Sequence, residues 1–319
     1  MHDLMVLDPA LPGTLSHAEA DALRGFAENE KAASTRRAYR ADFSAFEAWC
    51  TARGLCSLPA SPQVVARHIS AIACDGLSAS SIGRRLAGIA YAHKLTKLPS
   101  PTGSDNVRVI LAGIRRTLGT APKRKAAATA ERIKLMVDAC PSTMIGLRDR
   151  ALLAFGFAGA FRRSELVALQ VSDLEEVPDG YRVIIRRSKT DQTGEGAEIV
   201  IPRGLKIRPV AALQEWLQAA GITEGYLFRA VHRGGHVRAW GLRGADVAAV
   251  VKQYAEKAGL DPQEFSGHSL RAGFVTSAAE SGASILKIQE TSRHKSTDVL
   301  AGYVRRVDMF KDHAGAAFL

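Results

Sequence analysis

The sequence predicts two domains, an all-α domain followed by a mixed α/β domain that is mainly helical and contains a small antiparallel sheet. Three observations lead to this fold class. With 319 residues, the chain is too long for one small domain. Apolar residues recur at helical spacing along the chain as far as Leu118. Residues 181–201 differ, because they contain two short β-type runs around a polar turn.

The first domain is expected to hold five helices, each opened by a residue that suits a helix N-terminus. These residues are Ser16, Ser34, the Ser61-Pro62 pair, Ser78 or Ser80, and Asp105. Aromatic residues at helical spacing on the second helix indicate core rather than a binding platform; they are Tyr39, Phe43, Phe46 and Trp49. The fifth helix is expected to turn inward Val107, Ile110, Leu111, Ile114 and Leu118.

A basic segment without large apolar residues, Thr120 to Ala128, is the best candidate for a linker. It precedes Thr129, which can cap a new helix. We therefore expect one domain over residues 1–122 and a second over residues 123–319. The second domain is expected to contain helices near 130–140, 143–158 and 163–169, strands at 181–186 and 198–201, and helices near 207–220, 243–258, 269–281, 284–291 and 297–306.

The positive charge of the chain indicates a polyanionic partner, and nucleic acid is the first choice. The formal net charge is +11 and the pI is about 9.7. The stretch from Arg84 to Lys125 contains ten Lys or Arg residues and one acid, Asp105. Such a one-signed surface suits contacts with phosphates. A basic protein without a polyanionic partner remains the alternative at this point.

Several classes of protein are not expected from this sequence. It has no run of about 18 apolar residues, which argues against a transmembrane helix. The segment Met1–Gly13 lacks the basic and apolar stretches of a secretory signal. No metal-binding or nucleotide-binding motif occurs, so we expect neither a metal nor a cofactor. The cysteines form no CxxC pair, as in a reduced cytoplasmic protein; they are Cys50, Cys56, Cys74 and Cys140.

Two short motifs carry residues that suit phosphate chemistry. Arg162 and Arg163 lie between an apolar run and a helix. An arginine held against a buried segment needs an anionic partner, which is either Glu165 or a ligand phosphate. His268 and Arg271 lie three residues apart on one face of a helix, close to its start. This pairing suits a phosphate, although the HxxR pattern alone is weak.

Tyr303 lies in LAGYVRR, nine residues after His294, on a helix where a core role is the usual interpretation. The motifs AFRRSELVALQVSDL, SKTDQTG, HSLRAG and RHKSTDVLAGYVR nevertheless occur together in this order. Their order and spacing resemble the tyrosine recombinase (phage integrase) family over nearly the whole chain. In the first domain, RRAYRADFSAFEAWC and SASSIGRRLAGIAYAHKL look most like the Cre-type branch.

The resemblance implies a catalytic set of seven residues: Arg162, Glu165, Lys189, His268, Arg271, His294 and Tyr303. The two arginines would bind the non-bridging oxygens of the scissile phosphate, and the glutamate would orient the site. The lysine would protonate the leaving 5′ oxygen while the tyrosine attacks the phosphorus. His268 would handle the proton of the tyrosine, and His294 would hydrogen-bond the phosphate.

The resemblance also implies a set of DNA-facing residues, namely Arg36, Arg37, Arg40, Arg84, Arg85 and Arg243. The first five would face the major groove, and Arg243 could fork onto a guanine. Contact with phosphate alone is an equal alternative for each of them. The chain departs from the family where glycine is frequent, with Ala160 before the first arginine and Arg293 before the second histidine. These departures affect loop geometry and remove no reacting group.

The expected activity is site-specific recombination of double-stranded DNA at a defined target site, through a 3′-phosphotyrosyl link that needs no ATP. A cytoplasmic, nucleoid-associated homotetramer would form on two sites, with residues 308–319 of each protomer docked into a neighbour. Two alternatives remain at this point. A type IB topoisomerase uses the same chemistry as a monomer, and a DNA-binding regulator could keep the fold without the catalysis.

Overall fold

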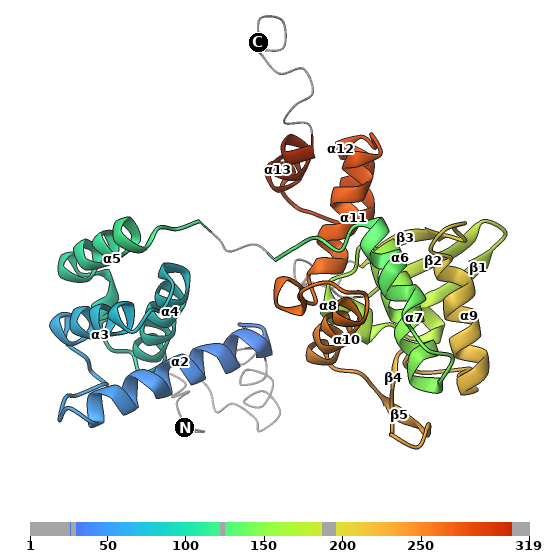
Figure 1. The fold of residues 1–319 in the computed structure, drawn as a ribbon. Helices are drawn as coiled ribbons and strands as arrows, with labels where there is room; N and C mark the ends of the chain where they lie inside the picture. Colours follow the sequence, from blue (N-terminus) through green and yellow to red (C-terminus); the bar gives the residue numbers. More distant parts are fainter. Residues whose placement is uncertain (1–25, 27–29, 122–124, 187–195, 308–319) are drawn as a thin grey trace, which may run out of the picture. The chain divides into compact units, whose positions relative to one another are not determined.

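The structure is a computed structural model that describes residue 26 and residues 30–121, 125–186 and 196–307. The chain divides into two compact units, Met1–Lys123 and Arg124–Leu319 (Figure 1). The described part of the first unit is helical, whereas the second unit combines helices with short strands. This architecture confirms the predicted fold class. The helix expected from Ser16 lies outside the described residues.

The described helices of the first unit begin as the sequence predicted except α2, which starts at Ala33 after Ala32 without a side-chain cap, so Ser34 does not open it. They are α2 (Ala33–Thr51), α3 (Pro62–Cys74), α4 (Ala79–Leu95) and α5 (Asp105–Leu118). Ser61 and Ser78 cap α3 and α4, and each accepts a hydrogen bond from the amide three residues later. The cap of α4 is therefore Ser78 rather than Ser80. Ser104, not Asp105, caps α5.

The core of the first unit lies where α2, α3 and α4 meet. Phe46, Ile69 and Ile89 are fully buried there, one from each helix. Phe43 is also buried and Trp49 packs against the same cluster, as predicted, whereas Tyr39 is half-buried outside this cluster and packs against Tyr91. Burying these side chains supplies the main force that holds the helices together.

Helix α5 differs from the prediction at two positions. Val107 is buried and both Leu111 and Ile114 pack against the core, but Ile110 and Leu118 are 37% and 45% exposed. The covered stripe of α5 thus follows positions i, i+4 and i+7. Ile110 lies beside this stripe, and Leu118 is the last residue of the helix. The inward placement of these two residues was wrong because periodicity does not give the width of the covered face.

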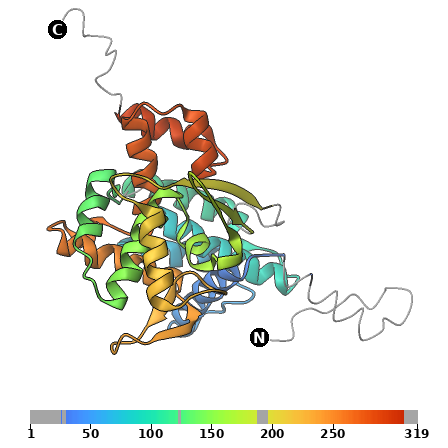
Figure 2. The ribbon, with the colours of Figure 1, turned by 90° about the vertical axis from the view of Figure 1, so that its right-hand side faces the viewer.

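The described part of the second unit has eight helices, and their ends fall within two residues of the predicted ranges. They are α6 (Ala130–Asp138), α7 (Met144–Ala158), α8 (Arg163–Ala168), α9 (Pro209–Ala220), α10 (Gly244–Lys257), α11 (Ser269–Glu280), α12 (Ile285–Ser292) and α13 (Thr297–Val307). Helix α7 is almost entirely buried, and its one charged stretch includes the buried ion pair of Arg148 with Asp149. It lies alongside α9, which packs one of its faces against it (Figures 1 and 2).

The strands of the second unit form a three-stranded antiparallel sheet and a separate hairpin. They are β1 (Leu174–Val177), β2 (Gly180–Ile185), β3 (Ala197–Pro202), β4 (Arg229–Val231) and β5 (Val237–Gly241). Tyr181 pairs with Ile201 and Val183 with Ile199, so these buried side chains cover one face. The sequence predicted β2 and β3 but missed the other strands, which are too short to show a period.

Helices α12 and α13 form a small layer of their own at one end of the second unit (Figures 1 and 2). They pack against α11 around a separate apolar cluster that includes Val275, Ile288 and Leu300. Tyr303 of α13 packs against this cluster. The tyrosine therefore depends on α11 for its position. Among the described residues, no helix has the length and apolarity that crossing a membrane requires.

His68 makes the stability of the first unit dependent on pH. The side chain is buried between Phe46 and Trp49, and neither ring nitrogen has a hydrogen-bond partner among the described residues. Burial lowers the pKa of His68 from 6.5 to about 4, and the charges of Arg85 and Arg53 add to this effect. Between about pH 4 and pH 6.5, the unfolded chain therefore carries a proton on His68 that the folded unit lacks.

We expect the free energy of unfolding to fall by about 3 kcal/mol as the pH drops from 7 to 4, and His68→Leu to remove that part of the dependence. Urea unfolding followed by circular dichroism at several pH values measures both slopes. Equal slopes in the variant and the wild type would contradict this assignment.

Candidate active site

A tight turn between α7 and α8 places Arg162 against the buried interior. Ala160 adopts a positive φ of 45° in this turn, and the ring of Phe161 stacks on Phe155. Helix α8 and the start of α11 approach α7 closely at Gly156. A β-carbon at that position would lie 2.8 Å from Leu166 and 3.0 Å from Leu270. The glycine thus allows the first residues of α8 and α11 to lie side by side.

Glu165 binds Arg162 through both of its carboxylate oxygens. Oε1 accepts a hydrogen bond from Nη1 of Arg162 at 2.6 Å, and Oε2 accepts one from the backbone amide of Arg162 at 3.0 Å. Both side chains are buried. Burial acts to raise the pKa of Glu165, but Arg293 and Arg162 outweigh it and hold the pKa below its ordinary value. The carboxylate is therefore charged. Of the two anionic partners that the sequence left open for Arg162, Glu165 is one that the structure shows.

Arg271 of α11 lies at the same turn, and one of its donors is left without a partner. Nη1 donates to the carbonyl oxygen of Ala160 at 2.9 Å. Nη2 is buried and has no hydrogen-bond partner among the described residues. Burial lowers the pKa of Arg271 to about 9, and the charges of Arg162 and Arg293 add to this effect. A buried donor of this kind needs an anionic acceptor.

His294 follows α12 and is fixed by two hydrogen bonds. Its Nδ1 lies 2.8 Å from the hydroxyl of Ser292, and its carbonyl oxygen accepts from the side chain of Gln289 at 2.9 Å. Burial lowers the pKa of His294 to about 4, and the surrounding arginines act in the same direction. The imidazole is therefore neutral at pH 7 unless an anion binds beside it.

Tyr303 and His268 complete the described part of the predicted set. Tyr303 is partly buried on α13, and its phenol is close enough to Arg271 to affect the pKa of that guanidinium. His268 is exposed at the residue that precedes α11, three positions before Arg271. The structure thus brings Arg271 and Tyr303 into one neighbourhood. Lys189 lies outside the described residues.

The charges of this site are unbalanced within the described part of the chain. Three guanidinium groups, those of Arg162, Arg271 and Arg293, surround the single carboxylate of Glu165. Buried cations in excess of their counter-ions are stable only with an anionic ligand. A phosphate meets this need, and fixed cations would stabilise the charge that develops on its oxygens during transfer. No group of three or more His, Cys, Asp or Glu residues in the described ranges could hold a metal ion.

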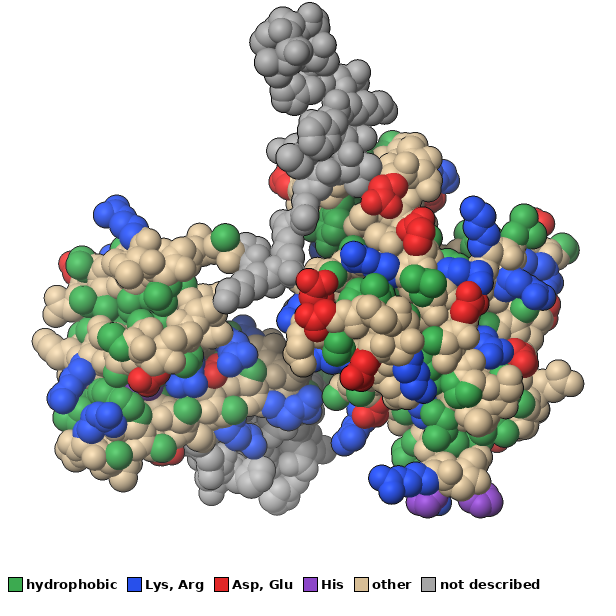
Figure 3. All heavy atoms as spheres, viewed as in Figure 1, with side chains coloured by type: hydrophobic (Ala, Val, Ile, Leu, Met, Phe, Trp, Pro, Cys, Tyr) green, Lys and Arg blue, Asp and Glu red, His purple; other side chains and the backbone are tan. Residues whose placement is uncertain are grey.

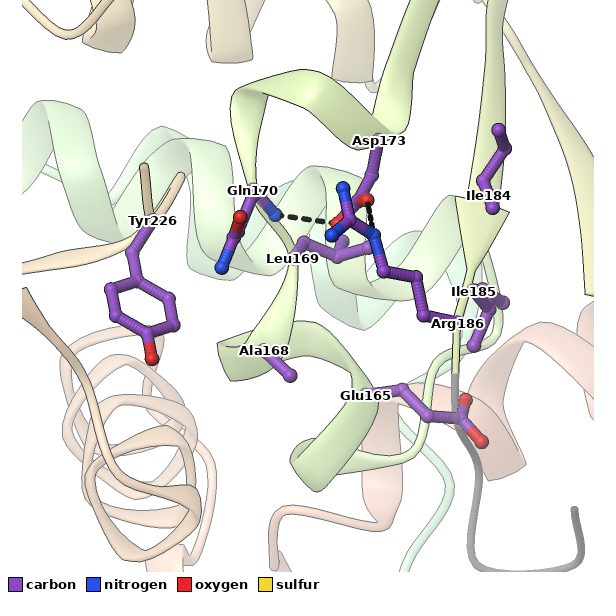
Figure 4. Close-up of a pocket in the computed structure, with 9 residues that line it drawn as sticks. All are labelled: Glu165, Ala168, Leu169, Gln170, Asp173, Ile184, Ile185, Arg186 and Tyr226. Atoms are coloured by element: carbon purple, nitrogen blue, oxygen red, sulfur yellow. Dashed lines mark hydrogen bonds and ion pairs between the residues drawn. The ribbon is translucent and has the colours of Figure 1, made fainter. Parts of the chain in front are cut away.

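A cavity of about 550 Å³ adjoins Glu165 and the end of β2 (Figure 4). Arg186 lines it, and its guanidinium binds the buried carboxylate of Asp173 at 2.6 Å and the hydroxyl of Ser172 at 2.8 Å. Arg186 is thereby fixed at the point where residues 187–195 continue from the strand. Nε and Nη2 of Arg186 are thus used within the fold, although the side chain is 58% exposed.

The predicted DNA-facing arginines lie on separate elements. Helix α2 carries Arg36, Arg37 and Arg40, and helix α4 carries Arg84 and Arg85. The guanidinium of Arg84 binds both oxygens of the buried Asp42, at 2.8 and 2.9 Å. While Arg84 is bound to Asp42, these two donor nitrogens cannot form a pair of hydrogen bonds with a guanine. The side chain of Arg243, which precedes α10, is 86% exposed.

Two features of this surface were missed from the sequence. Arg163 lies between the N-termini of α10 and α11, because β-carbons on Gly244 and Gly267 would be 3.5 and 3.3 Å from its side chain. The β4–β5 hairpin adds basic side chains, seen as blue and purple atoms at its end of the unit (Figure 3). The chain has no acid between Glu224 and Asp246, a signal that sequence reasoning could have used.

The chain is similar to known proteins over most of its length. The phage integrase family model matches residues 127–308, and the phage integrase N-terminal SAM-like domain matches residues 24–96. The integrase/recombinase xerD homolog of Selenomonas ruminantium is 39% identical over 90% of this chain and 86% of its own. The recombinase cre of Escherichia phage P1 is 24% identical over 82% of this chain and 80% of its own.

Among solved structures, the Tn1549 transposon integrase has the same fold, with a TM-score of 0.60 and 14% identity over 92% of this chain and 97% of that one. The family models carry the assignment, and they confirm the resemblance that the sequence motifs indicated. The chain belongs to the phage integrase family and is a tyrosine recombinase.

Proposed function

We propose that this recombinase cuts and rejoins double-stranded DNA at a specific site through a 3′-phosphotyrosyl link to Tyr303. The observation that carries the proposal is the excess of buried guanidinium groups, with Nη2 of Arg271 left unpaired among the described residues, in the neighbourhood of Tyr303. The relatives named as recombinases support the reaction, and the Tn1549 integrase, solved with transposon DNA, supports a duplex substrate. We place the reaction in the cytoplasm, at the nucleoid.

In this mechanism, Arg162 and Arg271 hold the non-bridging oxygens of the scissile phosphate, while Glu165 fixes the first of them. His294 donates to the same phosphate. We assign Nδ1, 2.8 Å from the Ser292 hydroxyl, as the acceptor of that contact, so that the neutral imidazole carries its proton on Nε2. These groups stabilise the negative charge of the transition state in a site that is already assembled.

The tyrosine oxygen attacks phosphorus, and the 5′ oxygen of the DNA leaves. A phenol with a pKa near 10 is a weak nucleophile, so His268 accepts its proton. Lys189 donates a proton to the leaving 5′ oxygen. In the second half of the reaction a 5′ hydroxyl attacks the phosphotyrosine and releases Tyr303. The bond energy is conserved in the covalent link, and no nucleotide cofactor is required.

Recognition of the target would use residues 1–122 as a core-binding domain and residues 123–319 as the catalytic domain. Arg36, Arg37, Arg40 and Arg85 would face DNA. Arg84 would join them only where it leaves Asp42. Arg243 is exposed before α10 and is able to fork onto a guanine. We further propose that residues 308–319 dock into a neighbouring protomer and close a tetramer on two sites.

Tyr303→Phe should bind DNA with wild-type affinity but form no covalent adduct, because only the attacking oxygen is lost. The substrate is the duplex recovered by selecting bound sites from random DNA, and a denaturing gel detects the adduct. Tyr226→Phe, which removes another hydroxyl of the second unit, should still form it. An adduct with Tyr303→Phe would exclude this nucleophile, and its absence from the wild type would favour the regulator that lacks catalysis.

Lys189→Ala should fail to cleave the normal duplex and should regain cleavage when sulfur replaces the bridging 5′ oxygen. A thiolate leaves without being protonated, so the general acid is no longer needed. Single-turnover rates on both duplexes test this, with Tyr303→Phe as the control that sulfur does not rescue. A variant that stays inactive on the sulfur duplex would assign the acid to another residue.

Deletion of residues 308–319 should leave binding to a one-site duplex nearly intact and abolish pairing of two sites. A terminal segment that docks in trans contributes to assembly and not to the grip of one protomer on DNA. Native gels and sedimentation on one-site and two-site duplexes measure both properties. Unchanged assembly into tetramers would refute the exchange and favour the monomeric reaction of a type IB topoisomerase.

A further inference from the structure

The loop before His294 contains a residue that no assigned role explains. Arg293 ends α12 in the left-handed conformation, with φ 56° and ψ 42°. Glycine is the residue that this position at a helix end usually carries, because a side chain is strained there. The guanidinium of Arg293 is buried together with Glu165, far from the solvent that an arginine normally reaches. A buried arginine in this backbone conformation therefore has to be stabilised by contacts of its side chain.

We infer that Arg293 is a positioning residue of the cleavage site, whose guanidinium fixes the His294 loop to Glu165 and to the turn beneath Arg271. The inference rests on the proposed cleavage reaction and adds a residue to it. Arg293 does not itself touch the phosphate in this assignment. It holds three groups that do, namely Arg162, Arg271 and His294.

The contacts of Arg293 run to each part of the site. Nη2 donates to Oε2 of Glu165 at 2.9 Å and lies 3.4 Å from the carbonyl oxygen of Ala160. Nη1 donates to the carbonyl oxygens of Gly159 at 3.2 Å and Thr291 at 2.6 Å. The guanidinium also lies over the ring of Phe161, 5.5 Å from its centre. One side chain thus joins the end of α12 to the turn between α7 and α8.

This network also sets the two phosphate-binding arginines. The backbone carbonyl of Arg293 accepts a hydrogen bond from Nη2 of Arg162 at 3.2 Å. The carbonyl of Ala160, which faces Arg293, accepts from Nη1 of Arg271 at 2.9 Å. Arg162 donates to both oxygens of Glu165, to Oε1 from its guanidinium and to Oε2 from its backbone amide, and Arg293 is a second donor to Oε2. Loss of the Arg293 guanidinium would therefore leave Glu165 bound to Arg162 alone and would detach the turn from the end of α12.

The charge of Arg293 acts on His294 as well. It is one of the positive charges that, after burial, lower the pKa of that imidazole. Removing it should raise the pKa of His294 from about 4. A change of this kind can be measured in the free protein, without DNA.

Arg293→Gly is the most direct test, because glycine keeps the left-handed backbone and removes the guanidinium. We expect the single-turnover rate of adduct formation to fall by roughly 10- to 100-fold with an unchanged Kd for the selected duplex, as for a misplaced reacting group. Arg293→Lys keeps the charge without the planar fork and should recover only part of the rate. Lys287→Ala, an exposed change on the same helix, should cleave like the wild type.

Nitrogen NMR of His294 supplies a measurement that does not depend on cleavage. Arg293→Gly should raise the pKa of His294 and alter the shift of Nδ1, which reports the bond to Ser292. Unfolding by urea identifies a variant that fails to fold, in which case Arg293→Lys provides the comparison. A wild-type cleavage rate in Arg293→Gly would overturn the inference. A parallel loss of rate and of DNA affinity would do so too, because it would make Arg293 a DNA contact.

Failure of the proposed function can be told apart from failure of this inference. If the wild type forms no adduct, the cleavage reaction is wrong whatever Arg293 does. The NMR measurement would then still show whether the guanidinium of Arg293 positions the His294 loop. An unchanged His294 titration together with unchanged nitrogen shifts in Arg293→Gly would show that the guanidinium does not position the loop.

Discussion

Sharing of the Glu165 carboxylate between Arg162 and Arg293, with Arg271 close by, is the interaction on which the site depends. Two buried guanidiniums are bound to its oxygens, and the third is held through the carbonyl of Ala160. One negative charge does not offset three positive ones in a region with little water. The second unit therefore folds around a site with an excess of positive charge among its described residues.

The backbone of this site carries strain at two facing positions. Ala160 and Arg293 both adopt positive φ, although neither is a glycine, and the guanidinium of one lies 3.4 Å from the carbonyl of the other. Strained residues persist where the surrounding contacts over-determine them, which is frequent at functional sites. Here the contacts of Arg293 with Glu165 and Phe161 supply that stabilisation. At one of the two departures from glycine, the loop is therefore held by side-chain contacts of Arg293.

Part of the positive charge of the chain is structural rather than free for DNA. Arg84 is bound to Asp42, Arg186 to Asp173 and Arg162 to Glu165, and in each pair the carboxylate is buried. A net charge of +11 gives the sign of the partner but not the residues that meet it. The fold uses some arginines to hold a helix, a strand end or a turn. Others, such as Arg243, remain exposed.

The sequence by itself determined the order of elements, most helix ends and, through its motifs, the family to which the chain belongs. Helical period and capping residues such as Ser61 and Ser78 are local signals, and the motif spacing singles out residues like Tyr303. Only the tertiary structure decided that Glu165 is shared with Arg293, 128 positions away, and that Arg84 binds Asp42 rather than solvent. It also decided the short strands and the outward side of α5. These features depend on which surfaces meet in space, and a local pattern does not contain that information.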